Sequence, residues 1–391
     1  MPKNTRNTTE SKYINYENLD KIGEVAIYYG FTPHQSPDIK KIDLDYAKNL
    51  LSGDYIDDEE EIKAHLPLHV EEKIALLRMY SENNMHTLPQ PIMLYFKEPF
   101  KGSIKKNPTT YHRYCDLEII GGSRSIAEAI LIQTARSILK EEGYENICVE
   151  INSIGDRDSI NRFSRDLSNY YRRHINDMNE KCKKMNEGAP KSMDFLSESS
   201  RTHFQEVLEY MEALGIQYKI NNNLIGNRKY CTETIFSITN LDYDKKEKGP
   251  KILAIGVRYD GLAKKIGLKH EVQGVGISII IKGNKANLRK SVKKMKRPFA
   301  SFVQLGFESK LLSLSIIENL RQVKIPLCLS LARDRLGAQV SVVEKNHFPY
   351  SLIMGKKEAV EKTIIVRNTD THAQDTIPIN DLPKYLKKLE K

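Results

Sequence analysis

The chain has 391 residues, a formal net charge of +10 and an apolar content of 40%. At this length we expect two or three domains, each with its own core. No apolar run approaches the roughly 18 residues that a membrane-spanning helix needs, and the polar first residues contain no hydrophobic secretory segment. The sequence therefore excludes a typical membrane protein and predicts a cytoplasmic location.

The five cysteines are widely spaced and include no CxxC pair. In a chain without a secretory segment, such a set is typical of reduced thiols in the cytosol. We therefore expect neither a zinc site nor any other metal site.

The positive charge is concentrated in the basic segment, residues 282–297 (KGNKANLRKSVKKMKR), where eight residues are basic and none is acidic. This segment supplies +8 of the net charge of +10. One interpretation is a solvated linker. The other is a segment that contacts phosphate, because clustered lysines and arginines gain affinity by releasing counterions from nucleic acid.

The first part of the chain is predicted to be a tail followed by helices and extended segments. Residues 1–12 are expected to be disordered, and apolar residues at helical spacing predict a helix that ends at Gly30. Pro33 and Pro37 favour extended backbone, because the residue before a proline avoids the helical region. The next predicted elements are a helix at 70–81 and strands at 91–96 and 116–120.

A long helix is predicted after Gly121 and Gly122, with Ser125 and Glu128 fitting a capping box at its start. The elements that follow are a strand at 147–151, a helix ending at 173, a helix from 198 to 214, and strands at 217–220 and 232–237. Strands outnumber crossover helices and lie close together in the sequence. This favours a mostly antiparallel sheet with helices on one side.

Residues 252–281 carry the most informative pattern. Two β-branched runs bounded by glycine, 252–255 and 275–281, predict buried strands on either side of the turn Arg258-Tyr259-Asp260-Gly261-Leu262. The polar side chains of this turn allow two interpretations. It is either part of a histidine or nucleotide pocket, or a structural turn in which Arg258 and Asp260 pair with each other or with neighbours.

Residues 298–391 form a β-α-β-α-β-β-α pattern that is complete in itself. Its crossovers predict a mixed, mostly parallel sheet. The predicted strands are 301–305, 326–330, 350–354, 363–367 and 376–379, and the predicted helices are 308–322, 336–346 and 382–389.

Taken in order, several segments resemble histidyl-tRNA synthetases over nearly the full length of the chain. EVAIYYGFTPHQSP resembles the first class II motif, and DLEIIGGSRSIAEAILIQTARSIL the helix after the second. YCTETIF and GVRYDGL resemble the two histidine-specific motifs, and GVGISI the third class II motif. MGKKEAVEKTIIVRN resembles the anticodon-binding domain that the His, Gly, Thr and Pro synthetases share.

This resemblance implies an α+β fold with two domains. Residues 13–281 would form a class II core, an antiparallel sheet with flanking helices. The basic segment would then be a linker to a small α/β anticodon-binding domain with a mixed sheet at 298–391. The resemblance also implies a homodimer. In an active member, ATP and Mg²⁺ would support the joining of histidine to the α-phosphate of ATP and its transfer to tRNA.

The chain departs from the family pattern where cations are needed. Charge that builds on a phosphate must meet fixed guanidinium groups, and lysine cannot form the bidentate fork of arginine. Without them, a barrier reduction of at least about 8 kcal/mol is hard to reach. The residues found at the family's arginine positions are Lys101, Pro108, Thr110, Gly226 (with Arg228 nearby) and Lys282-Gly283.

The histidine pocket implied by the resemblance is altered as well. Glu118 and Tyr230 match, whereas Cys231 replaces a tyrosine and Tyr114 a glutamine. The carboxylate for the substrate ammonium falls near His69, with Glu71 and Glu72 offset from it. The vestigial pocket would comprise Lys101, Glu118, Arg228, Tyr230, Arg258, Tyr259 and Asp260.

Three hypotheses remain open. The first is an inactive paralogue, without assigned catalytic residues, that binds tRNA or another structured RNA. The second is a divergent active histidine–tRNA ligase in which Lys101, Arg228 and Arg258 replace the missing arginines. The third is a regulatory subunit of the kind that partners ATP phosphoribosyltransferase. The residues predicted to contact RNA are Lys293, Lys294, Lys296, Arg297, Arg333, Arg335, Gln339, Lys356, Glu358, Arg367 and Gln374.

Overall fold

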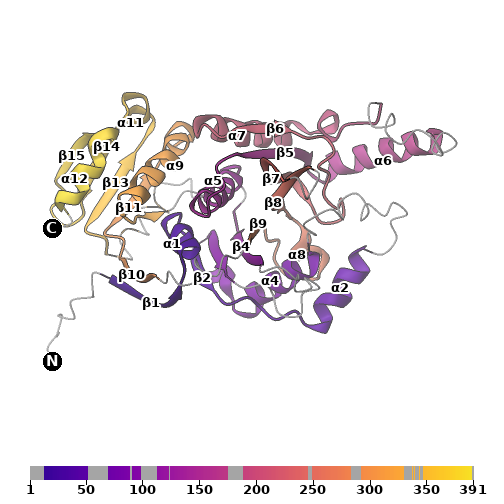
Figure 1. Ribbon diagram of the computed structural model, residues 1–391, viewed down its shortest axis with the longest axis horizontal. Coiled ribbons are helices and arrows are strands. Elements are labelled where there is room, and N and C mark those ends of the chain that lie inside the picture. Colours follow the sequence, from indigo (N-terminus) through magenta and orange to yellow (C-terminus); the bar gives the residue numbers. More distant parts are fainter. Residues whose placement is uncertain are drawn as a thin grey trace. The chain divides into compact units, whose positions relative to one another are not determined.

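The computed structural model divides the chain into two compact units (Figure 1). One comprises Phe31–Gly283, and the other comprises Met1–Gly30 together with Asn284–Lys391. The residues that the structure describes are 13–51, 69–88, 90–97, 112–122, 124–174, 188–244, 249–282, 292–329, 337, 339, 343 and 347–389. The predicted tail at 1–12 and most of the predicted helix at 336–346 lie outside this set. The described residues before Phe31 pack with the C-terminal residues, although the sequence-based domain bounds group residues 13–281 together.

An eight-stranded sheet forms the centre of the unit Phe31–Gly283. Only its edge pairs β2–β3 and β5–β6 are parallel, and every other neighbouring pair is antiparallel. The prediction of a mostly antiparallel sheet is therefore confirmed. In spatial order the strands are β2 (Thr32–His34), β3 (Ile92–Phe96), β4 (His112–Ile120), β9 (Gly274–Lys282), β8 (Gly249–Arg258), β7 (Thr232–Asp244), β5 (Ile147–Gly155) and β6 (Tyr218–Ile220).

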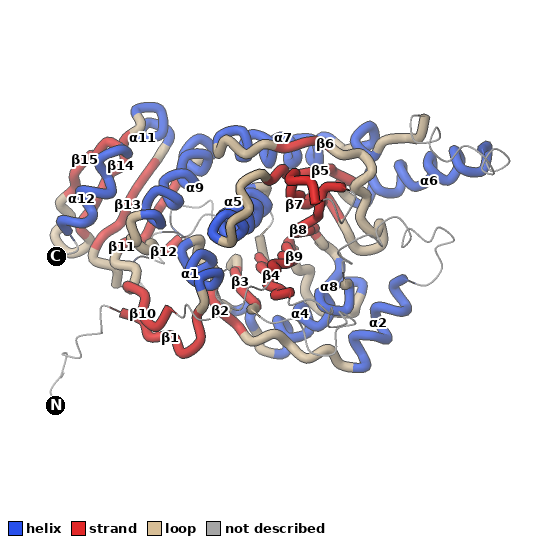
Figure 2. The backbone as a smooth tube through the Cα atoms, in the orientation of Figure 1, coloured by secondary structure: helices blue, strands red, loops and turns tan. Residues whose placement is uncertain are grey.

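Helices cover both faces of this sheet, not one as the sequence predicted (Figure 2). Helix α4 (Val70–Glu82) shares a hydrophobic core with Ile120 and Val257 and packs against α8 (Leu262–Lys265) and α2 (Lys41–Leu51). Helices α5 (Ile126–Glu141) and α7 (Glu198–Ala213) contact each other and the strands from the opposite face. Helix α6 (Arg157–His174) follows β5, and short 3₁₀-helices occur at Met85–Thr87 and Ser192–Phe195.

The central strands of this sheet are buried over much of their length, because helices cover both faces. In β8, every residue from Leu253 to Arg258 is buried. Successive side chains of a strand point to opposite faces, so Val257 faces α4 while Arg258 faces α5. Neighbouring residues at the end of β8 therefore lie on opposite faces of the sheet.

The other unit contains a five-stranded mixed sheet. Strand β11 is parallel to β12 and β13, whereas β13–β14 and β14–β15 are antiparallel, so the sheet is mixed as predicted but not mostly parallel. Its strands are β12 (Cys328–Leu329), β11 (Ala300–Gln304), β13 (Tyr350–Met354), β14 (Thr363–Asn368) and β15 (Gln374–Pro378). The helices described beside this sheet are α9 (Phe307–Gln322), α11 (Lys356–Glu361), α12 (Leu382–Leu389) and a 3₁₀-helix at Ile379–Asp381.

The start of the chain joins this second unit. Strand β1 (Tyr13–Leu19) pairs antiparallel with β10 (Val292–Lys296) in a two-stranded sheet, and helix α1 (Lys21–Tyr28) contacts α9. The Tyr29 hydroxyl donates a hydrogen bond to the Glu318 carboxylate of α9. The end of the basic segment is thus a strand, which the sequence analysis did not predict. Among the described helices, none is both long and apolar enough to cross a membrane.

Candidate functional site

Glu118 of β4 forms a closed charge cluster on the α4 face of the sheet. Its carboxylate is fully buried, forms an ion pair with Lys73 of α4, and accepts a hydrogen bond of 2.8 Å from the Tyr259 hydroxyl. The Lys73 Nζ also lies 5.8 Å from the centroid of the Tyr259 ring. We call Lys73, Glu118 and Tyr259 the lysine cluster.

Burial is the main cause of the pKa shifts of Glu118 and Tyr259. Burial raises the pKa of Glu118, while the charge and hydrogen bond of Lys73 oppose the shift. Burial and the neighbouring Glu118 carboxylate raise the pKa of Tyr259 well above its usual value, so its hydroxyl remains a donor. The cluster also depends on two glycines of β9. A Cβ at Gly276 would collide with the Glu118 carboxylate, and one at Gly274 with the Tyr259 ring.

Arg258 forms a second cluster on the α5 face. Its Nε and Nη2 donate to the two oxygens of Glu128 at 2.7 and 2.6 Å, a bidentate pair between fully buried side chains. Its Nη1 donates to the Gly122 carbonyl at 3.0 Å and lies 3.4 Å from Asp260. His203 of α7 bonds Glu128 at 2.8 Å. We call Arg258, Glu128, His203 and Asp260 the arginine cluster.

In the arginine cluster, the positive charges of Arg258 and His203 stabilise the buried carboxylate of Glu128. Burial alone would raise the pKa of Glu128, but the charges and hydrogen bonds of Arg258 and His203 outweigh it and hold that pKa at about 2. Burial likewise opposes the charged form of His203, yet the Glu128 carboxylate raises the pKa of the imidazole. Asp260 also accepts the backbone N–H of Gly274 at 2.9 Å.

The predicted capping box at the start of α5 is wrong. Ser125 has helical backbone angles, makes no capping hydrogen bond, and donates its hydroxyl to Glu206. Glu128 turns away from the helix end to meet Arg258. A glutamate three residues after a serine is the signature of a capping box, but here the same spacing serves an ion pair.

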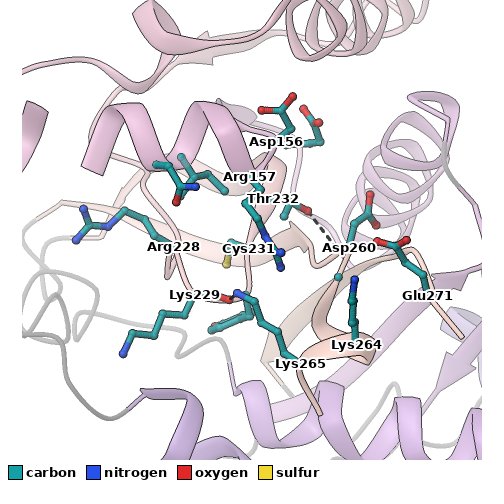
Figure 3. A pocket seen from close by; sticks show the side chains of 15 residues that line it. Asp156, Arg157, Arg228, Lys229, Cys231, Thr232, Asp260, Lys264, Lys265 and Glu271 are labelled. Carbon is teal, nitrogen blue, oxygen red and sulfur yellow. Dashed lines mark hydrogen bonds between the residues drawn. The ribbon is translucent and has the colours of Figure 1, made fainter. Parts of the chain in front are cut away.

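A pocket of about 610 Å³ lies beside the turn that follows β8 (Figure 3). Its apolar lining includes Ile160, Tyr230 and Cys231. Five cationic side chains line it, namely Arg157, Arg228, Lys229, Lys264 and Lys265. Four carboxylates also line it, namely Asp156, Glu233, Asp260 and Glu271. Its size is typical of small-molecule sites, which span about 300–1,000 Å³.

Comparisons with known proteins agree with the motifs. A family model described as an anticodon binding domain matches residues 303–389. A histidine–tRNA ligase of Fervidobacterium nodosum is 26% identical over 387 residues and covers 90% of each chain. A histidine–tRNA ligase of Caldanaerobacter subterraneus is 22% identical over 421 residues, with 99% of each chain covered.

The chain is histidyl-tRNA-synthetase-like. The crystal structure of apo histidyl-tRNA synthetase of S. aureus shares its fold, with a TM-score of 0.50, 21% identity and 93% of each chain covered. The resemblance inferred from the ordered motifs is confirmed. So is the fold class, an antiparallel-dominated sheet with flanking helices followed by a smaller mixed sheet.

The described residues of the vestigial pocket divide between the two charge clusters and the pocket of about 610 Å³. Glu118 and Tyr259 belong to the lysine cluster, whereas Arg258 and Asp260 belong to the arginine cluster. Arg228, Tyr230 and Asp260 line the pocket, and Tyr230 is only 4% exposed. Burial raises the pKa of the adjacent Cys231 to about 12, so this thiol is unreactive. Lys101 lies outside the described residues.

The partners in these clusters had little signal in the sequence. Lys73 stands among apolar residues of α4, where a lysine normally marks a solvated face. His203 lies next to Phe204 of the apolar stripe of α7, and no motif marked it as a partner of Glu128. The spacing of Glu128 from Ser125 predicted a capping box instead of an ion pair with Arg258. The one available signal was the position of Lys73 itself, a charged residue at a predicted core position. Charged residues are fully buried almost only when they are paired, so this position could have indicated a buried partner.

The residues predicted to contact RNA fall into different settings. Lys294 and Arg297 are exposed and Lys296 is half-buried, whereas the side chain of Lys293 and the residues Arg333 and Arg335 lie outside the described part. Gln339 is fully buried and its amide bonds the backbone of Gln304 in both directions, at 3.0 and 2.8 Å. Its role is internal, which removes it from the candidate RNA surface.

The remaining RNA candidates lie on the mixed-sheet unit. Lys356 is exposed and lies 3.6 Å from Glu308, while Glu358 accepts the Gly355 N–H at 2.9 Å and so caps α11. Arg367 and Gln374 occupy paired positions on β14 and β15. Of this group, Lys356, Arg367 and Gln374 remain candidates for contact.

An active synthetase would use Mg²⁺, which proteins usually bind through one or two carboxylates and the phosphates of the substrate. No three His, Cys, Asp or Glu side chains in the described ranges are placed to hold a metal ion. The buried carboxylates Glu118 and Glu128 are each held by a cation and a second hydrogen-bond donor. No step through a metal ion follows from this arrangement.

Proposed function

We propose that this chain binds tRNA or another structured RNA and does not activate histidine. The lysine cluster carries the proposal. Glu118 is the carboxylate that the resemblance assigns to the histidine pocket, and here the chain's own Lys73 ammonium and Tyr259 hydroxyl engage it inside the core. A substrate would have to displace a buried ion pair to reach Glu118, which is costly.

The arginine cluster supports the same conclusion. Arg258 is the arginine of the best-preserved motif, yet it is fully buried and its guanidinium is divided among Glu128, Asp260 and two backbone carbonyls. A cation that stabilises a transferring phosphoryl group must point at the place where charge develops. Arg258 instead serves to join β8 to α5.

RNA binding is supported by the other unit. Its sequence matches an anticodon-binding domain, and the exposed cations Lys294 and Arg297 lie on and just after β10. Clustered surface cations bind a phosphate backbone mainly through counterion release. A homodimer located in the cytoplasm, as the sequence predicts, belongs to this proposal.

Binding to unfractionated tRNA, measured by filter retention over a salt series, tests this proposal. We expect affinity to fall steeply with salt. The Lys294→Ala/Arg297→Ala variant should weaken binding and reduce the slope of log affinity against log salt by about 2, one per lost phosphate contact. The matched control, Lys140→Ala/Lys219→Ala, removes two exposed lysines of the other unit and should leave the slope unchanged. Absent binding at low salt, or binding insensitive to salt, would contradict the proposal.

The alternative is a divergent active histidine–tRNA ligase that uses ATP and Mg²⁺. It is favoured by the two relatives, both named histidine–tRNA ligase, which match along nearly their whole length. Activity would require Lys101, Arg228 and Arg258 to replace the missing arginines. The commitment of Arg258 to Glu128 weighs against this, and histidine-dependent turnover decides between the two functions.

A further inference from the structure

Two exposed histidines, His86 and His270, meet at one end of the eight-stranded sheet. His86 lies in the 3₁₀-helix Met85–Thr87, which leads into β3, and His270 lies in the loop that leads into β9. Strands β3 and β9 both pair antiparallel with β4, and the first residue of each lies opposite Ile120. The two segments therefore reach the same end of the strands from distant parts of the sequence. We call His86 and His270 the histidine pair.

Each member of the histidine pair is anchored by a buried neighbour in the sequence. Met85, directly before His86, is 7% exposed, and Val272, two residues after His270, is 5% exposed. Both anchors belong to the same hydrophobic cluster. The Gln90 amide also donates a hydrogen bond of 2.9 Å to the Met85 carbonyl. Because the backbone on both sides is held in this way, the pair is positioned before a ligand arrives, which lowers the entropic cost of binding.

The separation of the two rings matches that of two imidazoles on one metal ion. The ring centroids lie 5.1 Å apart and the ring planes are tilted by 32°. Aromatic pairs prefer offset-stacked or edge-to-face arrangements, and this tilt lies between the two. With a Zn–N bond of about 2.0–2.1 Å, the centroid of a bound imidazole lies roughly 3 Å from the metal, so two rings on one tetrahedral ion have centroids roughly 5 Å apart. Exposed side chains change rotamer within nanoseconds, so the nitrogens of both rings can turn toward one ion.

The ring nitrogens of the histidine pair are available to a ligand. Within the part of the chain that the structure describes, neither ring makes a hydrogen bond or an ion pair, and each contacts the other. By contrast, His203 is bonded to Glu128 in the arginine cluster. Neutral imidazole is the commonest metal ligand in proteins and suits zinc, copper and nickel.

We propose that the histidine pair binds one first-row divalent transition-metal cation, of which Zn²⁺ and Cu²⁺ are the favoured examples. The described ranges place no third His, Cys, Asp or Glu side chain at such a site, so water completes the coordination. The bound ion joins the segments that enter β3 and β9. The site departs from the absence of metal expected from the cysteines, because it depends on a contact that spacing in the sequence does not show. It is independent of RNA binding, so either proposal can fail while the other holds.

Calorimetric titration of the full chain with Zn²⁺ tests the site. His86→Phe and His270→Phe each keep an aromatic ring but remove the ring nitrogens. We expect each substitution to weaken binding at this site by about tenfold or more, because the second imidazole no longer adds an intramolecular contact. His34→Phe is the matched control, since His34 is exposed and its ring contacts Phe96 instead of another histidine; this variant should bind Zn²⁺ as the wild type does. Equal binding of Zn²⁺ by the wild type and both pair variants would overturn the proposal.

Electron paramagnetic resonance with one equivalent of Cu²⁺ counts the imidazoles on the ion. We expect two imidazoles in the wild type and in His34→Phe, and one in each pair variant. A single imidazole in the wild type would show that Cu²⁺ occupies isolated histidines, and the proposal would fail.

The melting temperature separates metal binding from ring packing. Zn²⁺ should raise the melting temperature of the wild type and of His34→Phe but not of the pair variants, because a ligand of the folded state stabilises it by mass action. Without Zn²⁺, all four proteins should melt at the same temperature. A pair variant that melts lower without metal, yet gains as much from Zn²⁺ as the wild type, would show that the rings only pack together and would contradict the proposed site.

Discussion

Arg258→Met should lower the free energy of unfolding by about 3–5 kcal/mol, the cost of removing one partner from a buried ion pair. The substitution keeps much of the apolar volume but removes Arg258 as a partner of the fully buried Glu128 carboxylate, which keeps its bond to His203. It also removes donors from the carbonyls of Gly122 and Arg124. Urea denaturation followed by circular dichroism measures the effect.

Two further variants separate the charge effect from lost packing. Arg201→Met, on the exposed surface of α7, should change stability by no more than about 0.5 kcal/mol. Adding Glu128→Gln to Arg258→Met removes the stranded charge and should recover part of the loss, giving a clear coupling energy. Strictly additive effects of the two substitutions would contradict the arginine cluster.

Lys73→Met should lower the free energy of unfolding by about 3–5 kcal/mol at neutral pH, and by less in acid. The Glu118 carboxylate would keep only the Tyr259 hydroxyl as a partner. Its pKa, already raised by burial, would then rise further above the ordinary value of 4.5. Below pH 4.5 the carboxyl is protonated in both states and the deficit is small. The wild type also loses stability above pH 4.5, because its own Glu118 pKa is raised. The deficit of the variant therefore grows at higher pH, where folded wild-type Glu118 releases its proton and the folded variant still retains it.

Stability measured from pH 4 to pH 8 tests this dependence. Lys48→Met, on the exposed face of α2, is the matched control and should follow the wild type at every pH. Lys73→Met/Glu118→Gln removes the titrating carboxyl group, so the difference in stability between Lys73→Met and this double variant should depend on pH through Glu118. A deficit of Lys73→Met that stays constant with pH would mean that packing, not the Glu118 charge, causes it.

The backbone plan was accessible from the sequence because local patterns determine it. Short β-branched runs bounded by glycine marked β8 and β9, and the close spacing of strands predicted their antiparallel pairing. Period-two alternation even implies that Arg258 and Tyr259 face opposite sides of the sheet. Local patterns could not predict that helices cover both faces of the sheet. The face on which a helix packs depends on contacts with residues far away in the sequence.

The partners in the two charge clusters could not be predicted from local sequence patterns either. Arg258 was singled out by its motif, but its partner Glu128 lies 130 residues away and fitted a local capping role equally well. Lys73 lies 45 residues from Glu118 and carried no motif. The basic charge of β10 concealed a strand that only its pairing with β1 reveals. In each case a non-local contact gives the residue a role that its neighbours in sequence do not indicate.

Histidine-dependent exchange of pyrophosphate into ATP, measured with and without tRNA, decides whether the chain activates histidine. In the proposed function the chain binds RNA, while Lys73 engages Glu118 and Arg258 is paired with Glu128, so neither is available to a substrate. Under conditions where tRNA is retained on filters, we expect no exchange above the protein-free background with histidine present. Sustained exchange that requires histidine would contradict the proposed function and establish the chain as an active ligase.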